Sequence, residues 1–135
     1  MNFSIVIPLY NKAPYVEDTL LSVINQTKLP YELIIVDDKS TDESLQIVKA
    51  FLEENSPQFK DIRVEIIELK ENCGPGFARN IGFKKTSGDF ISFLDADDLY
   101  HPQLIQKANQ LALKHHIDFL VIGIQLFPSN IERPK

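Results

Sequence analysis

Short apolar runs alternate along the chain with longer segments in which apolar residues recur at helical spacing. Runs rich in β-branched and aromatic residues predict strands at 3–8, 32–36, 63–69, 89–94 and 119–124, and helical spacing predicts helices at 15–26, 77–85 and 102–115. Alternation of this kind is typical of βαβ units, in which helices connect parallel strands. The pattern therefore predicts an α/β protein with a parallel sheet.

Two local signals refine this pattern. The segment 32–36 (ELIIV) is almost uninterrupted in its apolar character, as expected of a central strand covered on both faces. The segment 40–43 (STDE) has the spacing of a capping box, which predicts that a further helix begins there.

Length and composition predict one domain. The chain has 135 residues, of which 44% are hydrophobic and 24% charged, so it can bury a single core. We expect this domain to cover residues 1–126. The remaining segment, 127–135 (FPSNIERPK), is polar and contains two prolines, and we interpret it as a truncated or polar tail.

The charge balance limits the kinds of ligand. A formal net charge of -5 argues against a nucleic-acid surface, because affinity for a polyanion comes mainly from lysine and arginine. A phosphate group bound by this chain would therefore need a metal ion or backbone amides.

Cysteine content and hydropathy bear on location. The single cysteine, Cys73, cannot form an internal disulfide, and the N-terminus lacks the features of a signal peptide. No apolar run approaches the roughly 18 residues that a membrane span needs. We expect a cytoplasmic protein that contacts the inner face of a membrane only through sequence outside this chain.

Polar and glycine-rich residues follow four of the predicted strands. In open α/β sheets, ligands bind beyond the carboxyl ends of the strands, so these residues are the candidate site. They are Tyr10 and Asn11 after the first strand, Asp37 and Asp38 after the second, residues 72–76 after the third, and Asp95, Ala96, Asp97 and Asp98 after the fourth.

The acids after the fourth strand carry the strongest chemical signal. Asp95 and Asp97 have D-x-D spacing at the end of an apolar run, and Asp98 follows directly. Carboxylates placed so closely repel one another unless a cation offsets them, and hard oxygen ligands suit Mg²⁺ or Mn²⁺ bridging a diphosphate. The alternative is a solvated turn whose charge favours the amino end of the next helix.

The acids after the second strand and the aromatic residue after the first are candidates for nucleotide contacts. A carboxylate of Asp37 or Asp38 can accept hydrogen bonds from a base or ribose, and Tyr10 can stack on a base. The alternatives are an Asx turn ahead of Ser40 for the acids and ordinary half-burial for Tyr10.

The segment 74–76 (GPG) allows close approach of the backbone to a ligand and precedes a predicted helix. Arg79 lies in the first turns of that helix, where it can pair with a phosphate or contact a base edge. The alternative for Arg79 is a surface salt bridge. The chain has no G-x-G-x-x-G after its first strand, no P-loop and no H-E-x-x-H motif, which argues against the corresponding enzyme classes.

Four motifs together resemble the N-terminal half of family 2 of the nucleotide-sugar glycosyltransferases, which are inverting enzymes with the GT-A fold. They are SIVIPLYN (4–11), LIIVDDKSTD (33–42), ENCGPGFARNIGF (71–83) and GDFISFLDADD (88–98), and the resemblance runs from residue 3 to about residue 102. The resemblance implies a Rossmann-like, open, mostly parallel sheet with helices on both faces, and a C-terminal part of the fold beyond this chain.

The resemblance also implies roles for individual residues. Asp38 would contact uracil or ribose, Arg79 would lie near the base or diphosphate, and Asp95 and Asp97 would hold Mn²⁺ or Mg²⁺, with Asp95 also near the ribose. The full nucleotide-binding set expected is Pro8, Leu9, Tyr10, Asn11, Asp37, Asp38, Gly76, Arg79, Asp95 and Ala96. The family often has glycine where this chain has Lys39.

The implied reaction is transfer of a sugar, with inversion, from a nucleotide sugar such as a UDP-sugar to a hydroxyl of a saccharide or lipid-linked acceptor. The family's general base lies in a region that we cannot place here, so no catalytic residue is assigned and this segment alone is expected to transfer poorly. One alternative is a stand-alone nucleotide-sugar binding module. Another is a receiver-like domain, which would leave the second acidic cluster and the GPGFARN segment without a role.

Overall fold

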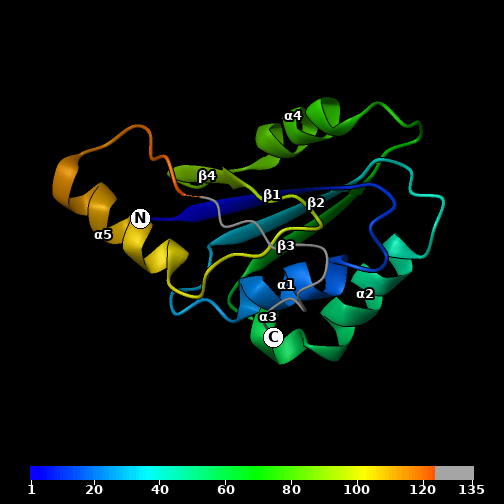
Figure 1. The fold of residues 1–135 in the computed structure, drawn as a ribbon, viewed down its shortest axis with the longest axis horizontal. Coiled ribbons are helices and arrows are strands. Elements are labelled where there is room, and N and C mark those ends of the chain that lie inside the picture. The colour runs from blue at the N-terminus through cyan, green and yellow to red at the C-terminus, as the bar shows by residue number, and fades with distance from the viewer. Residues whose placement is uncertain (124–135) are drawn as a thin grey trace.

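A four-stranded parallel sheet lies between two layers of helices in the computed structural model, which describes residues 1–123 (Figure 1). The strands are β1 (Phe3–Leu9), β2 (Glu32–Asp37), β3 (Arg63–Glu68) and β4 (Phe90–Phe93). The helices are α1 (Val16–Ile24), α2 (Ser44–Glu54), α3 (Ser56–Phe59), α4 (Pro75–Lys85) and α5 (Leu104–His115). The predicted α/β class and parallel sheet are confirmed.

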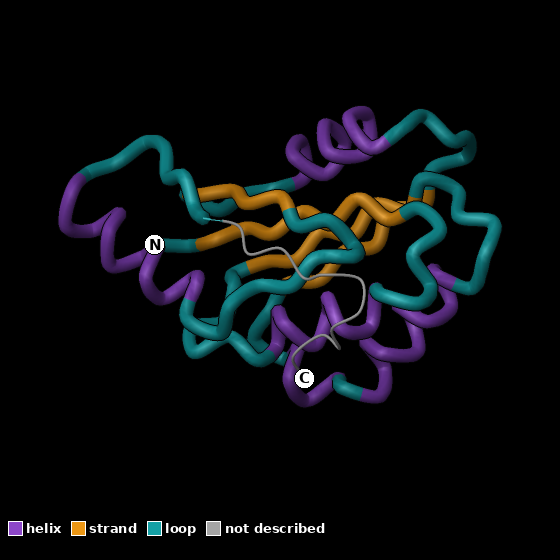
Figure 2. The backbone as a smooth tube through the Cα atoms, viewed as in Figure 1, coloured by secondary structure: helices purple, strands orange, loops and turns teal. Residues whose placement is uncertain are grey.

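The strand order is β3-β2-β1-β4, so the chain changes direction across the sheet after β3. Helix α4 makes this crossing on one face, while α1, α2 and α3 cover the other (Figure 2). The order reverses between β1 and β4, and ligands of open α/β sheets bind at such a switch point, outside the carboxyl ends of the strands.

Strand β1 is buried along its whole length, and its alternate side chains join two separate clusters. Ile5, Ile7 and Leu9 belong to the larger cluster, which includes residues of α1, α2 and α5. Val6 faces the other way and packs with Ala78 of α4. A buried aliphatic side chain stabilises the fold by about 1.5–3 kcal/mol, so this strand is the centre of the core.

Helix α4 approaches the sheet closely at Gly82. A Cβ atom added there would stand 2.3 Å from Cγ1 of Val6 and 3.2 Å from Cγ2 of Val36. Real Cβ contacts are not that short, so a glycine is needed for the observed distance between the helix and the sheet.

Pro8 lies inside a central strand, where proline is normally excluded because it lacks an N–H group. Alternate residues of β1 bond to opposite neighbours: the carbonyl of Leu9 accepts from Asp38 N in the segment after β2, and the carbonyl of Val6 accepts from Leu94 N after β4. Pro8 therefore faces the β4 side, where β4 has already ended. No ladder hydrogen bond is lost there.

Glu32 begins β2 at the end of the sheet away from the switch point, and its side chain is fully buried. It accepts hydrogen bonds from the hydroxyl of Ser4 and the backbone N–H groups of Ser87 and Gly88, and it pairs with Arg63 at 2.7 Å. Burial raises the pKa of this carboxyl, but these hydrogen bonds outweigh burial and hold the pKa below its ordinary value.

Two expectations from the sequence are corrected, and one short helix was missed. The capping box at 40–43 is wrong: α2 begins at Ser44 without a side-chain cap, because Ser40 accepts a hydrogen bond from the Asn11 backbone instead. The short helix α3 was not predicted. The strand at 119–124 is not formed over 119–123, where Phe119 and Val121 are exposed because no neighbouring strand pairs with them.

Ile124 and the predicted polar tail at 127–135 lie outside the described residues. Within the described residues, none of the helices has the length and apolar character needed to cross a membrane.

Candidate functional site

The predicted site segments meet at the carboxyl ends of β1, β2 and β4, as the parallel sheet requires. The loop after β1 is fastened to the loop after β2 by Asn11. Its side-chain Oδ1 accepts from the backbone N–H groups of Thr41 at 2.8 Å and Asp42 at 3.2 Å. Asn11 has a φ of 48°, a left-handed conformation that asparagine tolerates better than most residues. Asn11 therefore has a clear structural role.

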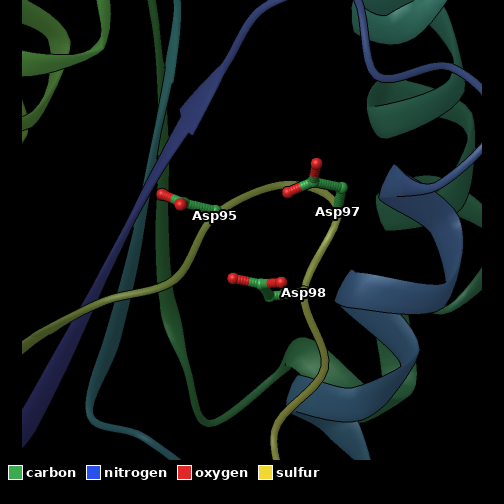
Figure 3. Close-up of side chains that lie close together, drawn as sticks. All are labelled: Asp95, Asp97 and Asp98. Atoms are coloured by element: carbon green, nitrogen blue, oxygen red, sulfur yellow. The ribbon is translucent and has the colours of Figure 1, made fainter. Parts of the chain in front are cut away.

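Three acids of the loop after β4 gather in one place (Figure 3). Asp95, Asp97 and Asp98 each offer a carboxylate oxygen, and these oxygens all lie within 4.8 Å of one another. Asp95 and Asp97 are half-buried and Asp98 is exposed. Several carboxylates at this separation suit a hard divalent cation such as Mg²⁺ or Mn²⁺, so the residues fit the predicted metal.

Helix α1 holds this acidic loop, defined as residues 95–98, in place. The hydroxyl of Thr19 is fully buried and lies 3.0 Å from the carbonyl oxygen of Ala96 and 2.8 Å from that of Asp98. Ala96, predicted as a nucleotide contact, is itself buried in the core. Its observed role is to anchor the loop, and a contact with nucleotide stays a prediction.

Two basic side chains pair with the acidic loop. Arg79 of α4 donates from Nη2 to Oδ1 of Asp95 at 2.7 Å. Lys12, from the loop after β1, places its Nζ 3.1 Å from Oδ2 of Asp97. Arg79 thus forms a salt bridge, as the alternative interpretation expected, but with a predicted site residue. Lys12 was missed, because a single lysine in a loop carries no pattern.

Asp38 is only 2% exposed, and both of its carboxylate oxygens bind backbone. Oδ1 accepts from Cys73 N at 2.7 Å and Oδ2 from Gly74 N at 2.9 Å. Gly74 has a φ of 91° and caps α4, a conformation that requires glycine. Asp38 therefore positions the loop and helix that carry Arg79, a role that sequence reasoning did not find. Its contact with a base or ribose stays a prediction.

Asp37 is also buried, and its carboxylate lies 3.3–3.4 Å from the backbone N of Ser40. This is the turn that the sequence offered as the alternative to a nucleotide contact. Lys39 within the turn has a φ of 58°, in the left-handed region that favours glycine, which matches the family's preference for glycine here.

The remaining predicted residues differ in accessibility. Pro8 and Leu9 are buried in β1. Tyr10, which follows them, is 43% exposed. Gly76 is exposed, and a Cβ atom added there would meet nothing within 4 Å, so the space beside it is open.

Tyr100 lies behind the acidic loop and was not predicted from the sequence. Its hydroxyl is hydrogen-bonded to Ser92 of β4, and its backbone N donates to Ser22 Oγ of α1 at 3.1 Å. Burial, opposed by the Ser92 hydrogen bond and assisted by the charges of Asp95 and Asp98, raises the pKa of Tyr100 to about 12. The phenol is therefore neutral, and it is hydrogen-bonded to β4, the strand that precedes the acidic loop.

Comparison with known proteins identifies relatives of the whole described fold. The family model described as glycosyl transferase family 2 matches residues 4–133. An uncharacterized glycosyltransferase of Haemophilus influenzae is 39% identical over 114 residues, covering 84% of this chain and 43% of the relative. Poly(ribitol-phosphate) beta-N-acetylglucosaminyltransferase TarS of Staphylococcus aureus is 34% identical over 128 residues, covering 93% of this chain and 21% of the relative. The chain thus spans less than half of these relatives.

Solved structures give the same result. S. aureus TarS 1-349 in complex with UDP matches with a TM-score of 0.83 and 31% identity, over 100% of this chain and 38% of that one. The complex of the same protein with UDP-GlcNAc matches with a TM-score of 0.82 and 32% identity, over 100% of this chain and 37% of that one. A mannosyltransferase from Pyrobaculum calidifontis, in complex with GDP-Man and Mn²⁺, matches with a TM-score of 0.73 and 25% identity, over 82% of this chain and 32% of that one.

Proposed function

The chain belongs to glycosyl transferase family 2, and from this premise we propose that it binds the donor in a metal-dependent, inverting transfer of sugar from a UDP-sugar to an acceptor hydroxyl. The observation that carries the proposal is the gathering of Asp95, Asp97 and Asp98 at the carboxyl end of β4. It is supported by the likeness to a glycosyltransferase structure that contains UDP.

The metal site is proposed at the acidic loop. Asp97 and Asp95 would bind Mn²⁺ or Mg²⁺ through their carboxylates, with Asp98 beside them. A divalent cation at this position would supply positive charge to the diphosphate that departs from the sugar. The net charge of -5 is consistent with a metal ion that supplies part of the positive charge for the diphosphate.

The nucleotide is proposed to lie between the loop after β1 and helix α4. The exposed ring of Tyr10 would stack on the base, and Arg79 would contact the diphosphate or the base. The open space beside Gly76 leaves room for part of the nucleotide sugar. Asp38 would contact the base or ribose with the lone pairs that its bonds to Cys73 and Gly74 leave available.

The buried members of the predicted set act through shape and backbone. Pro8, Leu9 and Ala96 would form the floor of the pocket, and Asn11 and Asp37 would hold the two loops beside it. These assignments stay predictions until a ligand is bound.

In the proposed reaction, a carboxylate removes the proton of the acceptor hydroxyl. The hydroxyl oxygen then bonds to the anomeric carbon as the bond from that carbon to the diphosphate breaks. We assign no general base to the described residues. Transfer by this chain alone is therefore expected to be weak, and the acceptor, a saccharide or lipid-linked saccharide, is not selected by the residues described here.

Calorimetric titration of UDP, with and without Mn²⁺, tests the donor site. Wild-type chain should bind UDP more tightly with Mn²⁺, and Asp97→Ala should lose that dependence. Asp61→Ala, which removes an exposed acid in the segment before β3, is the matched control and should bind as wild type does. Equal binding by Asp97→Ala and wild type would contradict the proposal. GDP is the competing ligand, since the P. calidifontis relative is complexed with GDP-Man.

The alternative of a binding module without catalysis is separated by a turnover assay. Release of UDP from UDP-GlcNAc by the chain in the presence of a saccharide acceptor, even at a low rate, supports an enzyme. Release that appears only after a partner protein is added supports a module that acts in a complex. Family membership removes the receiver-like alternative. The cytoplasmic location expected from the sequence stays a prediction.

A further inference from the structure

The ion pair between Lys12 and Asp97 joins two loops that are far apart in the sequence and meet at the switch point of the sheet. The ammonium nitrogen lies 3.1 Å from Oδ2 of Asp97, the carboxylate proposed as a metal ligand. Both side chains are about one-third exposed, at 39% for Lys12 and 36% for Asp97. Exposed ion pairs are weak, so water, salt or a competing cation can separate this one.

The backbone of Lys12 is held in place while its side chain extends into the site. Its N–H donates to Ser44 Oγ at 2.7 Å, and its carbonyl accepts from the N–H groups of Tyr15 and Val16, both at 2.9 Å. The next residue, Ala13, donates its N–H to Asp42 at 3.1 Å. The ammonium can therefore change its partner through side-chain rotation alone, with no movement of the loop.

The other side of the pair is equally well held. The buried hydroxyl of Thr19 fixes the carbonyl oxygens on either side of Asp97, those of Ala96 and Asp98. Arg79 forms an ion pair with Asp95, as Lys12 does with Asp97. Within residues 1–123, Lys12 and Arg79 each pair with one carboxylate of the acidic loop, and these two pairs lower the negative charge of that loop.

We propose that Lys12 is a displaceable counter-ion for Asp97. Without donor it occupies the carboxylate and competes with a divalent cation. When the cation binds Asp97, the ammonium is released to the diphosphate of the donor. This inference rests on the proposed function, because it takes its two ligands, a divalent cation and a nucleoside diphosphate, from the same site.

Charge and geometry favour this exchange. A divalent cation bound to Asp97 would lie within a few ångströms of the ammonium, and like charges at that distance repel each other. Lysine carries a compact charge on a flexible stem, which suits a group that changes from a carboxylate to a phosphate. A diphosphate that binds together with the cation would supply a new negative partner for the ammonium.

Lys12→Gln tests the exchange, because it should change the affinities for Mn²⁺ and for UDP in opposite directions. Binding of Mn²⁺ without nucleotide, measured from the electron paramagnetic resonance signal of free Mn²⁺, should tighten by about two- to five-fold, because the competing charge of a weak pair is gone. Binding of UDP at saturating Mn²⁺, measured by calorimetry, should weaken by about ten-fold, because one charged partner of the diphosphate is lost.

Two further variants make the test specific. Lys12→Arg keeps the charge, so its affinities for Mn²⁺ and UDP should depart from those of wild type less than the affinities of Lys12→Gln do. Lys49→Gln breaks a surface pair of similar length, 3.3 Å from Glu68 and away from the site, and should change neither affinity. A thermal unfolding curve for each variant checks that the fold is retained.

The outcomes separate the two proposals. Tighter Mn²⁺ binding with weaker UDP binding in Lys12→Gln supports the counter-ion role. Unchanged or weaker Mn²⁺ binding in that variant, with wild type still binding UDP and Mn²⁺, overturns the counter-ion role alone. Failure of wild type to bind UDP with or without Mn²⁺ overturns the proposed function, and the counter-ion role with it.

Discussion

Arg79 donates a hydrogen bond of 2.7 Å to Asp95 and so ties helix α4 to the acidic loop after β4. The two residues are 16 positions apart and come from opposite sides of the switch point. Arg79→Gln should weaken UDP binding in the presence of Mn²⁺ by about ten-fold or more, because a charge-assisted contact with the donor is removed. Calorimetry with wild type and the variant measures this loss.

Stability serves as the control for this prediction. The Arg79 and Asp95 side chains are 34% and 48% exposed, so their pair contributes less than about 1 kcal/mol to folding. The urea midpoint of Arg79→Gln should therefore stay near that of wild type. A large loss of stability together with unchanged UDP affinity would show that Arg79 supports the fold rather than the donor.

The second prediction concerns the close contact of α4 with the sheet. Gly82→Ala should lower the free energy of unfolding by about 1–3 kcal/mol, because the added methyl group overlaps Val6 and forces the helix to move. Gly76→Ala is the matched control in the same helix, since nothing lies within 4 Å of its added methyl group. The control should be neutral or more stable by up to about 1 kcal/mol. Equal effects of the two substitutions would contradict this account of the packing.

The third prediction concerns pH. The pKa of Glu32 is lowered in the folded chain, so its contribution is fully present above the ordinary value of 4.5 and is lost as the pH falls through the folded value. Glu32→Gln should cost about 1–3 kcal/mol at neutral pH, because buried donors lose a charged acceptor. The difference between wild type and Glu32→Gln should shrink below pH 4.5, in urea titrations repeated at several pH values.

Glu53→Gln is the control for the pH series, since Glu53 is exposed on α2. It should leave both the stability and its acid dependence close to wild type. A gap between wild type and Glu32→Gln that stayed constant down to strongly acidic pH would mean that the charge of Glu32 contributes nothing.

Much of the fold could be predicted because its strands are short, apolar and separated by clear helical periods. The run at 32–36 and the helix at 102–115 correspond closely to β2 and α5. Glu32 was hidden inside that apolar run, and only the fold shows that three uncharged donors and Arg63 bind its carboxylate. The capping box failed because Ser40 and Thr41 bind Asn11 instead of the helix.

The site could be predicted only where a motif stands next to a strand end. The acids at 95–98 were found this way, and the structure gathers them. Lys12 and Thr19 were not found, because their partners lie 77 or more positions away and only the strand order brings them together. Asp38 was found as a ligand candidate, but its two bonds to the backbone of α4's entry loop could not be read from spacing.

Pro8 limits how far β1 and β4 can close upon each other. In the observed register, Val6 pairs with Phe93 and accepts from Leu94, so the next rung would need an N–H from residue 8 to the carbonyl of Leu94. Proline cannot supply it. Hydrogen bonding between the two strands therefore ends here, and the chain after Leu94 leaves the sheet to form the acidic loop. The proline ring thus keeps the carboxyl ends of β1 and β4 unpaired at the place where the donor is proposed to bind.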